Sequence, residues 1–96
     1  MSTQEAYKQK IEAELTLAES KLVEFKAQVA NLAADERIKY DGQIGTLEEQ
    51  ITSTKAKLKE LTDADETVWE QMKDGVEHAW TSLSNSVHDL AAKFKS

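Results

Sequence analysis

The sequence predicts an all-α protein, and three observations support this fold class. Apolar residues recur at alternating gaps of four and three along most of the chain, the spacing of a helix face that packs on another helix. Proline is absent, so the strongest helix breaker is missing. No stretch shows the period of two that a half-buried strand requires.

Composition favours one small helical domain spanning residues 1–96. Charged residues make up 31% and hydrophobic residues 40% of the chain, which is ordinary for a soluble helical protein. The absence of cysteine excludes a disulfide framework, a thiol nucleophile and a Cys-based zinc site. A formal net charge of −6 disfavours nucleic acid as a partner. Because the first residues are polar and no window has the ~20 apolar residues of a membrane span, we expect a cytoplasmic protein.

The first helix is predicted to begin near Thr3. Ser2 and Glu5 have the spacing of a capping box, in which each side chain satisfies a free backbone amide at the helix start. The apolar residues from here to Leu61 form one seam, which we expect to mediate self-association. This seam comprises Ile11, Leu15, Leu22, Phe25, Val29, Leu32, Tyr40, Ile44, Leu47, Ile51, Leu58 and Leu61.

The middle of the chain allows two architectures. Leu32 and Tyr40 are eight residues apart where a continued heptad would give seven, so the helix either skips a residue or turns. Residues 33–39 are mostly good helix formers, whereas Asp41-Gly42 and Gly45 favour a turn. The leading expectation is a coiled-coil helix over about 3–61. The alternative is a three-helix bundle with a turn near 33–43.

The last helix is predicted over about 64–94. Thr62 and Asp63 are good N-caps, and Asp63 with Glu66 resembles a second capping box. In the leading architecture this helix folds back as a hairpin and leaves the seam from Ile11 to Val29 for another chain to cover. Its own amphipathic face comprises Trp69, Met72, Val76, Trp80, Leu83, Val87, Leu90 and Phe94.

Few residues suggest chemistry. His78 and His88 are ten residues apart on one helix and cannot share an ion. Glu70, Asp74 and His78 lie on one face, but a solvated face explains them better than a metal site does. The Glu-x-x-His spacing of di-iron bundles is absent. We therefore expect no catalytic residue, no metal and no cofactor.

The segment from Trp69 to Trp80 reads Trp-Glu-Gln-Met-Lys-Asp-Gly-Val-Glu-His-Ala-Trp. It resembles the pattern W-x-x-x-K-x-G-V-E-x-A-W of small bacterial coiled-coil proteins of unknown function, which have a similar size and a Lys/Glu/Ala-rich N-terminal coiled coil. The resemblance implies a bacterial source and a non-enzymatic helical protein.

The function expected from these patterns is helical self-association or scaffolding through the seam, as a homo-oligomer or with another helical protein. The alternative is a peripheral lipid-surface-binding or stress-protective protein that uses the helix from Trp69 to Phe94. Between Trp80 and Val87 the polar positions carry no charge, as in helices that sense lipid packing. Membrane-surface binding is the less favoured of the two.

Overall fold

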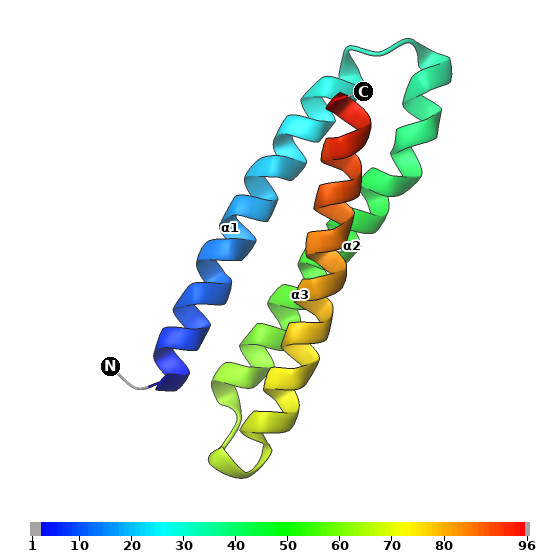
Figure 1. Ribbon diagram of the computed structural model, residues 1–96. Coiled ribbons are helices and arrows are strands. Elements are labelled where there is room, and N and C mark those ends of the chain that lie inside the picture. The colour runs from blue at the N-terminus through cyan, green and yellow to red at the C-terminus, as the bar shows by residue number, and fades with distance from the viewer. Residues whose placement is uncertain (1–2, 96) are drawn as a thin grey trace.

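The computed structural model describes residues 3–95 and contains three helices, α1 (Thr3–Ala30), α2 (Ala34–Asp63) and α3 (Glu66–Lys95) (Figure 1). The chain runs up, down and up again, so α1 and α3 are parallel and α2 is antiparallel to both. The bundle measures 51 × 21 × 18 Å. The predicted all-α class is confirmed, and Ser2 of the predicted capping box lies outside the described residues.

The turn between α1 and α2 contradicts the predicted continuous helix over 3–61. The helical pattern stops at Ala30, and Ala33 adopts an extended conformation with φ −63° and ψ 155°. Its carbonyl then accepts the amides of Glu36 and Arg37 at 3.0 and 2.9 Å and starts α2. Asn31 is a poor helix former, and Asp35 and Glu36 place negative charge on the first turn of α2, where the helix dipole favours it.

The three-helix alternative is therefore the observed architecture, but its turn lies at residues 31–33 and not at Asp41-Gly42. Gly42 and Gly45 are both inside α2. The turn folds α1 back onto α2, so the stretch from Ile11 to Val29 is covered by the same chain. The expectation that this stretch would need another chain is wrong.

The second turn falls where the sequence predicted a break, but a different residue caps α3. Asp65 accepts the backbone amides of Thr67 at 3.0 Å and Val68 at 3.4 Å, and also the Thr67 hydroxyl. Asp63 is instead the last residue of α2. The helix consequently starts at Glu66, two residues later than predicted. Hydrogen bonds from Thr67 and Val68 hold the pKa of Asp65 below its ordinary value.

The core combines most residues of the predicted seam with apolar residues of α3. All three helices contribute to one apolar cluster: Ile11, Leu15, Ala18, Phe25, Val29, Ile44, Leu47, Ile51, Leu58, Leu61, Trp69, Val76, Leu83 and Leu90. Thr54, a polar residue of α2, is also fully buried, and its hydroxyl donates to the Gln50 carbonyl at 2.7 Å. The buried hydroxyl is thus satisfied within its own helix.

Two ion pairs connect α1 to α2. Lys26 contacts Glu48 with N···O 2.7 Å, and Lys55 contacts Glu19 with N···O 2.6 Å. From the first pair to the second, each helix advances seven residues in the opposite direction, as an antiparallel heptad requires. The order of charge reverses between the pairs, because α1 supplies the lysine in one and the glutamate in the other.

Aromatic rings join the three helices near the α1–α2 turn. The ring of Phe94, in the last turn of α3, stacks on Phe25 at 5.4 Å between centroids and on Tyr40 at 4.9 Å. The interplanar angles are 20° and 21°. Each helix contributes one ring, so this stack closes that end of the bundle.

The three glycines give the first prediction. A Cβ built on Gly42, Gly45 or Gly75 meets no atom within 4 Å, so alanine fits at each position. We expect each Gly→Ala variant to raise the free energy of unfolding by about 1 kcal/mol, because alanine loses less backbone entropy in a helix. Urea unfolding measures this change. Ala56→Gly, at an exposed site inside α2, is the matched control and should lower the free energy of unfolding by a similar amount. If all three Gly→Ala variants were less stable than the wild type, the added methyl groups would not fit as the structure indicates.

Asp65 gives a pH-dependent prediction. Because its folded pKa is depressed from the ordinary value of 3.8, the carboxylate stabilises the fold above that pH, and the contribution is lost as pH falls through the folded pKa. Asp65→Ala should therefore lower the urea midpoint at neutral pH, and the gap from the wild type should narrow in acid. Asp63→Ala is the control and should lack this narrowing. A gap that widens as pH falls would contradict the capping role.

Candidate interaction surface

Most of the predicted self-association seam lies inside the bundle and not on its surface. Most seam residues are buried in the bundle, while Leu22 and Tyr40 are partly buried and pack against its core. Leu32 is partly buried beside the turn. The seam therefore serves the fold of one chain and offers little free surface to a second.

The amphipathic face of α3 also points into the bundle. Trp69, Val76, Leu83 and Leu90 are buried, and Met72, Trp80, Val87 and Phe94 are partly buried against the core. Both indoles border a surface pocket, but they differ in exposure: Trp69 is 7% exposed, whereas Trp80 is partly exposed. Trp80 is thus the more accessible of the two tryptophans.

An aromatic and cationic cluster joins α1 to the start of α3. Tyr7 and Trp69 meet edge to face with centroids 5.8 Å apart. The ammonium of Lys73 lies over both rings, 5.1 Å from the Tyr7 centroid and 5.5 Å from the Trp69 centroid. Such a cation stabilises the pair through the negative faces of the rings. The cluster anchors the parallel helices α1 and α3 at this end.

The Tyr7 hydroxyl in this cluster is buried and makes no hydrogen bond of good geometry within residues 3–95. Burial, then the charge of the nearby Glu77 carboxylate and a weak hydrogen bond to it, raise the pKa of Tyr7 to about 12. Glu14 and Asp74 add smaller effects in the same direction. A phenol whose pKa is raised this far stays neutral at physiological pH, so it is unsuited to act as a base there.

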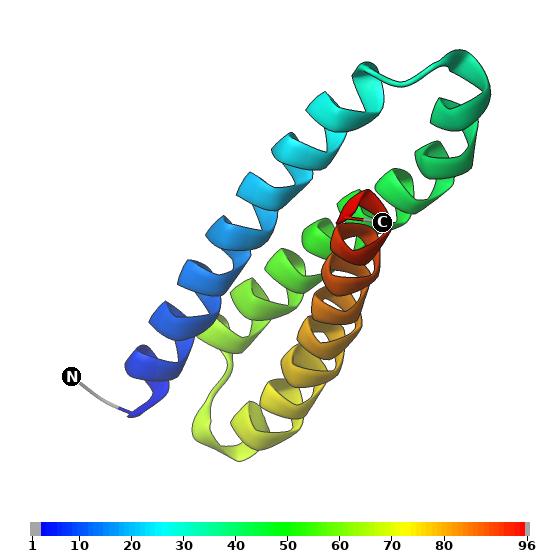
Figure 2. The ribbon, with the colours of Figure 1, turned by 45° about the horizontal axis from the view of Figure 1, so that its top comes forward.

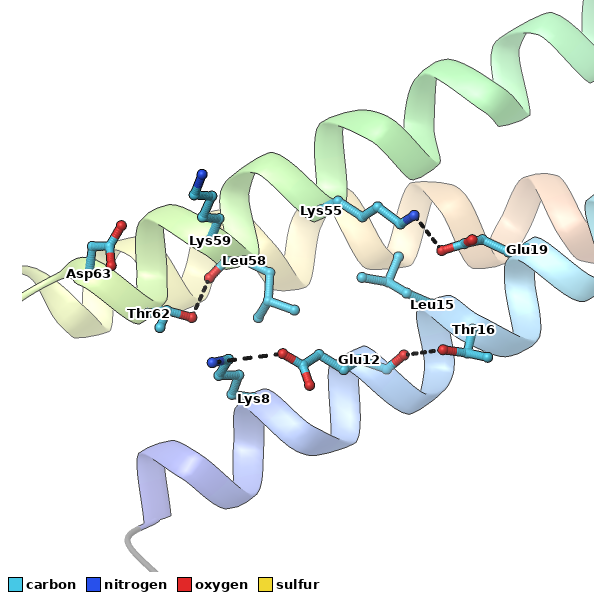
Figure 3. A pocket seen from close by; sticks show the side chains of 10 residues that line it. All are labelled: Lys8, Glu12, Leu15, Thr16, Glu19, Lys55, Leu58, Lys59, Thr62 and Asp63. Carbon is cyan, nitrogen blue, oxygen red and sulfur yellow. Dashed lines mark hydrogen bonds and ion pairs between the residues drawn. The ribbon is translucent and has the colours of Figure 1, made fainter.

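A groove of about 490 Å³ lies between α1 and α2 (Figure 3). Leu15 and Leu58 line it between charged side chains of both signs. Lys8 pairs with Glu12 at 3.8 Å and Lys55 with Glu19 at 2.6 Å. The hydroxyls of Thr16 and Thr62 donate to carbonyls of their own helices. Four of the six charged side chains of the groove are thus paired, and its three lysines and three acids cancel in charge.

A smaller groove, of about 200 Å³, lies between α1 and α3 and is mostly apolar. Its lining residues are Glu14, Leu17, Ala18, Lys21, Trp80, Ser84 and Val87. The two helices pack less extensively against each other than either packs against α2. Figure 2 shows α2 passing behind the space between them. Leu17 is 67% exposed here, so this groove presents apolar surface to solvent. We call it the α1–α3 groove.

The candidate metal ligands of α3 do not form a site. His78 and His88 are exposed on this helix. Within residues 3–95, the structure holds no group of three or more His, Cys, Asp or Glu side chains arranged to hold a metal ion. None of the helices in the described part of the chain is long and apolar enough to cross a membrane.

Sequence reasoning missed Leu17. It lies outside the 4–3 seam, one position before Ala18, and an isolated apolar residue on a charged face carries no signal by itself. Its significance comes from Trp80 and Val87 on α3, which share the groove with it. The arrangement of α1 beside α3 was needed to bring these residues together.

Comparison with known proteins does not assign this chain to a family. No protein-family model matches the chain, and neither a curated protein nor a solved structure matches it.

Tyr7 gives the prediction for this cluster. Because its pKa is raised, the neutral phenol stabilises the fold below pH 10, the ordinary value, and this contribution is lost as pH rises toward 12. Tyr7→Phe should be at least as stable as the wild type at neutral pH, since the buried hydroxyl that it removes makes no well-formed hydrogen bond. It should also be less sensitive to alkali. Urea unfolding at neutral and alkaline pH measures both effects, and a clear loss of stability at neutral pH would show that the hydroxyl is satisfied.

Proposed function

We propose that this chain is a non-enzymatic helical protein that acts by associating with a second copy of itself. The observation that carries the proposal is the α1–α3 groove. Two parallel helices leave an apolar channel in which Leu17 is 67% exposed and Trp80 and Val87 are partly exposed. Apolar surface gathered in a groove is typical of sites where a helix of a partner docks.

The proposed site of association is this groove and not the seam. The seam residues already cover one another across α1, α2 and α3, so a partner that bound them would first have to open the bundle. The groove needs no such opening. Association through it is also compatible with a scaffold role, because the opposite face of the bundle stays exposed.

The distribution of polar groups supports a role without catalysis. In the larger groove four of the six charged side chains form ion pairs, Lys8 with Glu12 and Lys55 with Glu19. A cytoplasmic location, and a bacterial source as implied by the Trp69–Trp80 pattern, complete the proposal.

The lipid-surface alternative makes a different demand on the structure. Trp69, Val76 and Leu83 of α3 are buried, so α3 would have to leave α1 and α2 to insert these residues. That opening would expose the matching core residues of the other two helices. Self-association requires no such step, and we therefore favour it.

The test of the proposed function is the mass of the full chain in solution. We expect sedimentation equilibrium to show a monomer–dimer equilibrium at micromolar concentration, with the dimer dominant at the upper end. The measurement is repeated with neutral, highly curved vesicles, where we expect no blue shift of tryptophan emission. A monomer at all concentrations would remove self-association as the function, and a vesicle-dependent blue shift would favour the lipid alternative.

A further inference from the structure

We infer that the second copy docks antiparallel across the α1–α3 groove, with its α1 against α1 and with Leu17 of both copies at the two-fold axis. This inference rests on the proposed function, which it makes specific by naming the surface, the orientation and the alignment. The order of charges along α1 and the residues that line the groove support it.

The face of α1 beside the groove carries a second 4–3 pattern, immediately next to the buried seam. Each of its members precedes a seam position by one residue, so it runs along the whole groove on one side of the helix. Three members, Glu14, Leu17 and Lys21, line the groove itself. We call this set the flank stripe: Lys10, Glu14, Leu17, Lys21 and Glu24.

The charges of the flank stripe are ordered so that the stripe complements itself. In chain order it reads positive, negative, leucine, positive, negative. Turning a second copy antiparallel about Leu17 places Lys10 opposite the partner's Glu24, and Glu14 opposite the partner's Lys21. The symmetry repeats both pairs, which gives four opposite-charge contacts around one apolar centre.

The same order of charges disfavours the other orientation. In a parallel, aligned pair each side chain of the stripe would face its own copy, so Lys10 would meet lysine and Glu14 would meet glutamate. Like charges placed opposite one another are repulsive. The stripe therefore selects the antiparallel pair, in which no like charges are opposed.

The groove supplies the apolar centre of this contact. An antiparallel α1 of the second copy lies over the groove and brings its Leu17 against Ala18, Trp80 and Val87, which line it. By symmetry the first copy's Leu17 enters the partner's groove. At the rim the intrachain contact of Lys21 with Glu24 is exposed and measures 3.3 Å. Rearranging such an exposed pair costs little, so Lys21 can turn toward the second copy.

Charge reversal tests the alignment. Glu14→Lys places two lysines opposite each other at both ends of the contact, and Lys21→Glu does the same with two glutamates. We expect each variant alone to raise the dimer Kd about tenfold by sedimentation equilibrium. An equal mixture restores opposite charges at both pairs, so it should form heterodimers with a Kd near that of the wild type, detected by native mass spectrometry.

A matched pair of apolar variants tests the centre. Leu17 and Val23 are 67% and 66% exposed on the same helix, but only Leu17 lines the groove. Leu17→Asp should raise the Kd about thirtyfold or more, whereas Val23→Asp should leave it unchanged. Circular dichroism and urea unfolding confirm that both variants fold, which their exposure leads us to expect.

The outcomes separate the two proposals. A wild-type dimer that is weakened by Leu17→Asp and re-formed by the mixed charge variants supports both. A wild-type dimer that tolerates Leu17→Asp and both reversals overturns this interface and leaves self-association standing. A dimer weakened equally by Val23→Asp also overturns it. A wild-type monomer overturns the proposed function and this interface together.

Discussion

The alignment of α1 on α2 determines the rest of the structure. The apolar seams of both helices repeat every seven residues, so sliding one helix by a heptad would still bring apolar side chains together. The two ion pairs between the helices favour the observed alignment. A slip in one direction would oppose Glu19 to Glu48, and a slip in the other would oppose Lys26 to Lys55. Exposed ion pairs contribute little to stability, so these two contacts favour the observed alignment by a small amount.

The position of α3 follows from the surface that the aligned hairpin presents. Tyr7 and Trp69 hold α3 to α1 at one end, and Phe94 joins Phe25 to Tyr40 at the other. Between these two anchors α3 leans on α2 and leaves α1 less covered. The α1–α3 groove lies between these two aromatic anchors, and the flank stripe borders it on α1.

The sequence predicted the helical class and the second turn because both depend on local signals. Periodicity sets the helices, and Thr62 to Glu66 combines capping residues with an acidic first turn. The leading expectation, a continuous helix over about 3–61, missed the first turn, and the alternative placed it near 33–43, because Gly42 and Gly45 are turn signals that the packing of α2 overrides. Their helix penalty is small beside the burial of Ile44 and Leu47 on the same turns of α2. Asp63 was predicted as a cap in place of Asp65, since both are aspartates within one helical turn.

The groove could not be predicted, because Leu17 and Trp80 are 63 residues apart in the sequence and meet only through the packing of α1 beside α3.

The aromatic stack also bears on the order in which the protein is assembled during synthesis. Phe25 and Tyr40 belong to the hairpin that emerges first from the ribosome, whereas the ring that stacks on both of them belongs to the last turn of α3. The hairpin therefore lacks this third ring until residue 94 has left the exit tunnel. During that interval the nascent chain exposes apolar surface that α3 later covers. Exposed apolar surface of this kind favours binding to chaperones and aggregation with other chains.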